Sequence, residues 1–209
     1  MALTNLLTKT AAALAQAEIP YLIIGGQAVL LYGEVRFTQD ADVIIALPTS
    51  QANLVLTALE HLNPTCPTST PVEFVKQNTV LPLINPESGA RIKLIFSTSP
   101  FEQRAIERAN VVKVGNTPVN FAALNDLIIY KVIAGRARDF DDIRSIARKN
   151  LPALDIAYIK NGWHCFKKKV ENRLPASSPI YVTNLESILK KSNRLRGELI
   201  TQFRFQPGQ

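Results

Sequence analysis

Apolar positions in the first two thirds of the chain recur with two periods, one helical and one extended. Apolar runs bounded by glycine or proline predict two short buried strands, at residues 21–24 and 42–47. Stretches with helical spacing predict three helices, at residues 3–17, 27–32 and 49–62. Thr49 or Ser50 is the expected cap of the third helix, because both side chains accept a hydrogen bond from backbone N–H groups.

The middle of the chain mixes strands with a helix, and the remainder predicts helices alone. Further strands are expected at residues 72–75, 80–84, 91–96, 111–114 and 118–121. Further helices are expected at residues 101–109, 124–134, 137–148, 154–170 and 183–195. This order is typical of an α+β lobe with a mixed sheet followed by a helical lobe. We place the two lobes at residues 1–122 and 123–209.

The composition favours a globular protein and excludes a membrane-spanning one. Hydrophobic residues make up 46% of the 209 residues and charged residues 20%. No apolar run approaches the roughly 20 residues that a spanning helix needs. The first residues lack the basic and apolar segments of a signal peptide, so we expect a cytoplasmic protein. The two cysteines, Cys66 and Cys165, are expected to be free thiols.

The net charge of +7 is concentrated toward the C-terminus. Residues 1–150 hold 14 Lys and Arg against 13 Asp and Glu, a net charge of +1. Residues 151–209 hold 10 Lys and Arg against 4 Asp and Glu, a net charge of +6. Such a basic segment is suited to bind a polyanion such as RNA, or it is a solvated face that aids solubility. The sequence leaves both interpretations open.

One group of residues has the chemistry of a nucleotide site. Gly25 and Gly26 follow a predicted strand and open a helix, where free N–H donors and the helix dipole favour phosphate. Asp40 and Asp42 are two residues apart beside the next strand, so their carboxylates share one face. Paired carboxylates are ligands that Mg²⁺ prefers, with triphosphate oxygens completing the shell. Taken singly, a pair of glycines is usually a turn, and two acids near the start of a strand are usually solvated or capping groups.

These residues resemble the signature of the nucleotidyltransferase superfamily. The variant with Gly25-Gly26-Gln27-Ala28-Val29 and Thr38-x-Asp40-x-Asp42 looks like the bacterial AbiEii-like branch. The resemblance extends over roughly residues 21–148, and the further matching stretches are residues 91–96, 100–104, 126–131 and 135–142. It implies an α+β nucleotidyltransferase fold, an NTP substrate, and Mg²⁺ or Mn²⁺ as the cofactor.

The resemblance also implies a role for each matched residue. Asp40 and Asp42 would bind metal and, with Lys131, carry catalysis. The other matched residues would contact the nucleotide, namely Gly25, Gly26, Arg36, Thr38, Lys93, Arg136 and Asp139. Asp139 and Asp142 would order the pair of Lys131 and Arg136. The residues alone also permit structural roles, with Lys131 at a helix end, Arg136 in a surface ion pair, and the two acids in a first helical turn.

Lys93 departs from the family pattern, which has a third carboxylate at this place. In a two-metal site that acid helps to hold the catalytic metal, whereas an ammonium repels it. The sequence leaves three outcomes open. The ammonium replaces one metal, another acid such as Glu102 or Asp139 takes over, or catalysis is lost while nucleotide binding survives.

Two classes of function are therefore expected. The first is an enzyme that transfers a nucleoside monophosphate from an NTP to an unknown acceptor. One candidate acceptor is tRNA. In that case the protein would be the toxin of a toxin–antitoxin pair and would have an antitoxin partner. The second class is a catalytically impaired module that binds a nucleotide or a nucleic acid. Lys93 favours the second class, and the intact Asp40 and Asp42 pair favours the first.

Overall fold

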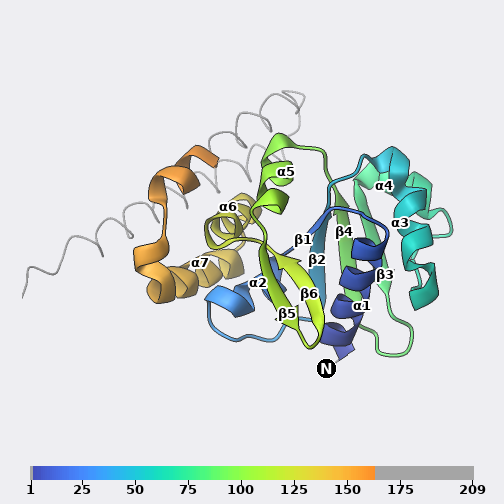
Figure 1. Cartoon of the computed structure of the whole chain (residues 1–209), viewed down its shortest axis with the longest axis horizontal. Coiled ribbons are helices and arrows are strands. Elements are labelled where there is room, and N and C mark those ends of the chain that lie inside the picture. Colours follow the sequence, from blue (N-terminus) through green and yellow to red (C-terminus); the bar gives the residue numbers. More distant parts are fainter. Residues whose placement is uncertain (1, 163–209) are drawn as a thin grey trace, which may run out of the picture.

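A mixed six-stranded β-sheet forms the centre of the computed structural model, which describes residues 2–162 (Figure 1). The strand order is β3-β4-β2-β1-β6-β5. The strands are β1 (Tyr21–Ile24), β2 (Asp40–Ile45), β3 (Val80–Ile84), β4 (Arg91–Phe96), β5 (Asn110–Val114) and β6 (Thr117–Phe121). β2 runs antiparallel to β1 and parallel to β4, and β1 runs parallel to β6. The expected α+β class with a mixed sheet is confirmed.

Helices connect the strands and cover the sheet. They are α1 (Ala2–Gln16), α2 (Gly25–Tyr32), α3 (Ala52–Leu59), α4 (Pro71–Asn78), α5 (Pro100–Glu107), α6 (Leu124–Ala134) and α7 (Ala137–Asn150). Three short 3₁₀ turns accompany them, η1 (Thr49–Gln51), η2 (Glu60–Leu62) and η3 (Leu151–Ala153). None of the helices in residues 2–162 is long and apolar enough to cross a membrane.

One face of the sheet forms the main core. Alternate residues of β2 and β4 point to this face and are at most 4% exposed, namely Ala41, Val43, Ile45, Ile92, Leu94 and Phe96. α1 packs against β2 and β6 and also against α3. Each fully buried aliphatic side chain stabilises the fold by about 1.5 to 3 kcal/mol. This packing fixes the strand register, because a slip of one residue would move every apolar side chain to the other face.

The same register fixes which residues occupy the opposite face near the start of β2. Asp40 pairs with Arg91, and Asp42 pairs with Lys93. On the other side of β2, Asp42 pairs with Ile24, the last residue of β1. Paired residues in neighbouring strands point to the same face, so two acidic and two basic side chains are grouped beside the beginning of α2.

α6 and α7 pack against α2, at the end of the molecule away from α3 and α4 (Figure 1). Gly135 separates the two helices and has a φ of 62°, the left-handed conformation that commonly ends a helix. After β6 the described chain contains helices only, with residues 156–162 as the last helical segment. The expected helix at residues 183–195 and the remainder of the helical lobe lie outside the described residues.

Two expectations about local structure are wrong. Residues 72–75 belong to α4 rather than to a strand, because Pro71 occupies the first turn of that helix and only Val75 is buried. β-branched residues suggested a strand here, but packing against the sheet determined the outcome. The stretch at 49–62 is helical but divided into η1, α3 and η2, and neither Thr49 nor Ser50 caps α3 with its side chain.

Candidate nucleotide and metal site

Gly25 lets the start of α2 lie directly against the carboxylate of Asp42. Its φ is +68°, a conformation that side chains rarely adopt. A Cβ atom at this position would lie 2.3 Å from Oδ2 of Asp42, far inside van der Waals contact. Glycine is therefore required for both its backbone conformation and its lack of a side chain. The backbone at the beginning of α2 and the Asp42 carboxylate thus form one surface.

Gly26 makes a second close approach, to the loop between α2 and β2. A Cβ atom there would lie 3.0 Å from Oγ1 of Thr38 and 3.1 Å from Nη2 of Arg36. The Thr38 hydroxyl donates to the backbone carbonyl of Asp40 at 3.0 Å. The structure therefore brings together residues that the sequence separates by seventeen positions or fewer: Gly25, Gly26, Arg36, Thr38, Asp40 and Asp42.

Asp40 is shared between two basic residues of β4. Lys93 Nζ lies 3.0 Å from Asp40 Oδ2, and Arg91 Nε lies 4.0 Å from Asp40 Oδ1. Asp40 Oδ1 is buried and accepts no hydrogen bond in the described part of the chain. A buried carboxylate oxygen without a donor is costly unless a cation or another ligand atom satisfies it.

Asp42 lies in a less favourable environment for a negative charge. Burial raises the pKa of its carboxyl above the usual value, and the charge of Asp40 raises it further. Lys93, Arg136 and Lys131 act in the opposite direction but do not reverse the shift. A divalent cation beside Asp42 would offset the cost of burying its negative charge. Perturbed pKa values of this kind are common among acids at functional sites.

The residues fit one divalent cation better than two. Asp42 and the unsatisfied Oδ1 of Asp40 supply hard oxygen ligands of the kind Mg²⁺ and Mn²⁺ prefer. Residues 2–162 contain no group of three or more His, Cys, Asp or Glu arranged to hold a metal. Lys93 occupies the β4 position of the expected third carboxylate, and its ammonium contacts Asp40 directly.

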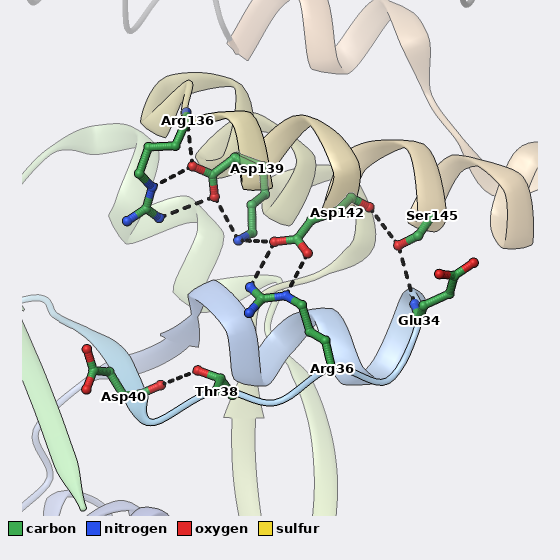
Figure 2. A network of polar contacts seen from close by, with 9 residues as sticks. Glu34, Arg36, Thr38, Asp40, Arg136, Asp139, Asp142 and Ser145 are labelled. Carbon is green, nitrogen blue, oxygen red and sulfur yellow. Dashed lines mark hydrogen bonds and ion pairs between the residues drawn. The ribbon is translucent and has the colours of Figure 1, made fainter.

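Lys131 is buried within a network of charged groups that joins α6, α7 and the loop after α2. Its Nζ atom donates to Asp139 Oδ1 at 3.0 Å and to Asp142 Oδ2 at 2.7 Å. The Lys131 side chain is 3% exposed, so it does not extend to solvent from the helix end. Figure 2 shows Arg36 reaching Asp142 from the loop and Arg136 bound to Asp139, with Asp40 apart from these pairs.

Arg136 and Asp139 are also joined at the beginning of α7. Asp139 accepts from the backbone N–H and the guanidinium of Arg136, so its carboxylate caps the beginning of α7. Burial alone would raise the pKa of Asp139, but the hydrogen bonds from Arg136 and Lys131 lower it overall. The hydrogen bond to Asp139 raises the pKa of Arg136. Asp139 is therefore ionised and paired with the side chains of Lys131 and Arg136. These contacts leave it poorly placed to replace the third carboxylate.

Glu102 is occupied elsewhere as well. It contacts the hydroxyls of Ser97 and Ser99 after the C-terminal end of β4, and its backbone N–H donates to Ser99 at the start of α5. Lys93 precedes that end of the strand by three residues. A carboxylate that is held by these two serine hydroxyls at the start of α5 does not substitute for an acid at position 93.

Two residues near the site were missed from the sequence. Arg91 lies two positions before Lys93, and strand periodicity alone places both on one face with the acids. Ser145 on α7 accepts from the backbone N–H of Glu34 at 3.3 Å, which helps to hold the loop. No local signal in the sequence indicates the contact between Glu34 and Ser145, because it joins segments 111 residues apart.

Solved structures of other proteins share this fold. The solution structure of the antibiotic-resistance factor ANT(2'')-Ia aligns with a TM-score of 0.56 at 12% identity, covering 81% of this chain and 93% of that one. An antigenic nucleotidyltransferase-like protein from Paracoccidioides brasiliensis aligns with a TM-score of 0.53 at 17% identity, covering 88% and 92%. No curated protein sequence gives a significant match.

A family model identifies the chain more closely. The model described as "Nucleotidyltransferase of unknown function (DUF6036)" matches residues 2–174, and the chain belongs to this family. The match includes the complete sheet and every candidate site residue.

Proposed function

We propose that the protein transfers a nucleoside monophosphate from an NTP to an acceptor hydroxyl. The observation that carries this proposal is the contact surface of Gly25 and Asp42, with Asp40 on the same face of β2. A glycine that admits a carboxylate at the beginning of a helix allows the triphosphate and its metal to meet there. Mg²⁺ or Mn²⁺, when bound, would neutralise charge on the transferring phosphoryl group.

Each site residue has a proposed role. Gly25 and Gly26 offer backbone N–H groups to the triphosphate, and Asp40 and Asp42 hold the metal. Arg36 and Thr38 order the loop beside the phosphates, and Arg136 adds positive charge near Asp42. In the reaction the acceptor oxygen bonds to the α-phosphorus, its proton passes to solvent, and the bond to the β-phosphate breaks to release pyrophosphate.

Lys131 and Asp139 are proposed to act through position rather than by contact with the substrate. Lys131 neutralises Asp139 and Asp142, and Asp142 in turn holds Arg36. Because Lys131 is buried by these partners, its role in catalysis would be to fix the loop and the start of α7. A positioning role of this kind is consistent with a buried, fully paired ammonium.

A transfer assay tests the proposal. The full-length protein is incubated with each α-labelled NTP, Mg²⁺ and total RNA, and labelled products are separated from free nucleotide. Asp42→Asn is the inactive control, and Asp141→Asn is the matched control on an exposed side chain of α7. Label transfer by wild type and Asp141→Asn, but not by Asp42→Asn, supports the proposal. Transfer that survives Asp42→Asn contradicts it.

A second candidate is a module that binds nucleotide without turnover. The ion pair of Lys93 with Asp40 favours this function, because it occupies one of the carboxylates that the reaction would need. The same protein preparation distinguishes the two. Nucleotide binding in calorimetry without transfer to any acceptor would establish the binding module.

We further propose that the acceptor is RNA. If the protein is an AbiEii-like toxin, the expected acceptor is tRNA, and an antitoxin would be its partner. The support is the charge of +6 in residues 151–209, within the proposed helical lobe of residues 123–209. Lys167, Lys168 and Lys169, the proposed contact cluster, lie outside the described residues. Binding of RNA should weaken steeply with salt if several phosphate contacts release counterions. A crystal structure of ANT(2'')-Ia holds adenylyl-2''-tobramycin, so tobramycin serves as the competing acceptor in the assay.

A further inference from the structure

We propose that Lys93 permanently supplies the charge of one cation at this site, so that the protein binds one divalent ion instead of two. The inference deepens the proposed function and rests on it for the nucleotide, but the metal stoichiometry is testable without any nucleotide.

The placement of Lys93 is determined by the sheet. β4 lies between β2 and β3, and Lys93 pairs with Asp42 on one side and with Pro82 on the other. Its neighbours Ile92 and Leu94 are buried in the core on the opposite face. The side chain can therefore leave β4 only on the face that carries Asp40 and Asp42. Its ammonium reaches Asp40 Oδ2 at 3.0 Å, while 46% of the side chain stays exposed.

The available ligand atoms then suffice for one ion. Oδ2 of Asp40 is occupied by Lys93, and Oδ1 of Asp40 is buried and accepts no hydrogen bond. Asp42 contributes the other carboxylate on the same face. These oxygens, together with phosphate and water, can complete the shell of one Mg²⁺ or Mn²⁺. A second ion would require the acid that Lys93 replaces and would be repelled by the ammonium.

Arg91 adds a second positive charge of the protein beside the carboxylate of Asp40. Its Nε atom lies 4.0 Å from the same unsatisfied Oδ1, and its side chain is 56% exposed. Two basic groups on β4 thus face the region where the triphosphate would lie beside Gly25. A site with built-in cations should retain part of its affinity for a triphosphate when divalent ions are removed.

Metal titration tests the inference directly. Mn²⁺ is added to the full-length protein without nucleotide, and bound and free ion are distinguished by electron paramagnetic resonance. Wild type should bind one Mn²⁺ per chain. Lys93→Met should bind one Mn²⁺ about tenfold more tightly, because the competing charge is removed. Lys93→Asp should bind a second ion. Lys113→Met is the matched control, since Lys113 lies on β5 at the far edge of the sheet.

Two Mn²⁺ ions bound by wild type, or equal Mn²⁺ affinity in wild type and Lys93→Met, would overturn the inference. Absence of Mn²⁺ binding in all variants would overturn it too. Circular dichroism and thermal unfolding show whether each variant is folded. A separate calorimetric titration with ATP in EDTA addresses the nucleotide. If ATP fails to bind with or without Mn²⁺ while the Lys93 variants shift Mn²⁺ as expected, the proposed function fails and the metal assignment stands.

Discussion

Arg36 binds Asp142 through two parallel hydrogen bonds, from Nε at 2.8 Å and from Nη2 at 3.0 Å. The contact ties the loop after α2 to α7 across 106 positions of sequence. Val35 and Phe37 on either side are 87% and 83% exposed, so the loop turns only alternate side chains inward. Lys149 also donates to the carbonyl of Gly33 at 2.7 Å. α7 therefore holds the loop that leads to Asp40.

Replacing Arg36 should loosen this loop. Arg36→Met removes two charge-assisted hydrogen bonds from Asp142, which remains paired with Lys131. We expect the free energy of unfolding to fall by about 1.5 to 3 kcal/mol, measured by urea denaturation. Affinity for ATP should fall as well. Arg138→Met, at an exposed position of α7, is the control and should leave both quantities unchanged. Equal stability of the two variants would show that the loop does not depend on Asp142.

Gly25→Ala should abolish metal binding through Asp42. The added Cβ would collide with Oδ2 of Asp42, and the residue would keep a positive φ. Gly89→Ala provides a matched control, because Gly89 has a φ of +67° but no atom within 4 Å of the added Cβ. Both variants should lose about 1 to 2 kcal/mol of unfolding free energy from the strained backbone. Only Gly25→Ala should lose Mn²⁺ affinity, and its retention would disprove the role of the contact.

Lys131→Met should destabilise the fold severely. Asp139 and Asp142 are 1% and 3% exposed, and the variant would leave their charges undercompensated in the interior. Loss of one partner from a buried pair typically costs about 3 to 5 kcal/mol. The midpoint of urea unfolding measures this effect. A variant that unfolds like wild type yet shows no transfer would instead place Lys131 in direct contact with the substrate.

Asp139 should make the protein sensitive to acid. Its pKa is lower in the folded protein than the ordinary value of 3.8, so the ionised form stabilises the fold. This contribution is complete above pH 3.8 and is lost as the pH falls through the lower folded pKa. The stability difference between wild type and Asp139→Asn should therefore be constant from about pH 5 to 7 and shrink below about pH 4. Asp141→Asn, an exposed neighbour, should show no comparable change.

Asp42 should have the opposite effect on stability. Because burial raises the pKa of Asp42 in the folded state, its ionised form opposes folding. The cost appears as the pH rises from 3.8 through the raised folded pKa and remains at neutral pH. Asp42→Asn should therefore raise the free energy of unfolding at pH 7, with a gain that disappears as the pH approaches 3.8. The same variant should lose Mn²⁺ affinity. A variant less stable than wild type at pH 7 would contradict this account.

The alternation of apolar residues was sufficient to predict most of the sheet. Val43 and Ile45 alternate with Asp42, and Ile92 and Leu94 flank Lys93, so one face of each strand is visibly apolar. The segment at 72–75 was mistaken for a strand because its valines satisfy a strand pattern equally well. Short apolar segments do not carry enough periodicity to separate a helix from a strand, and packing around Val75 decided the outcome.

The sequence by itself determined the residue types of the site and the face that Asp40 and Asp42 share, because strand period and glycine chemistry are local properties. Tertiary structure alone decided what those residues contact. Lys93 reaches Asp40 because β4 pairs with β2, and Lys131 is buried because α7 supplies two carboxylates beside α6. Such contacts depend on strand register and helix packing between distant segments, which no local pattern encodes.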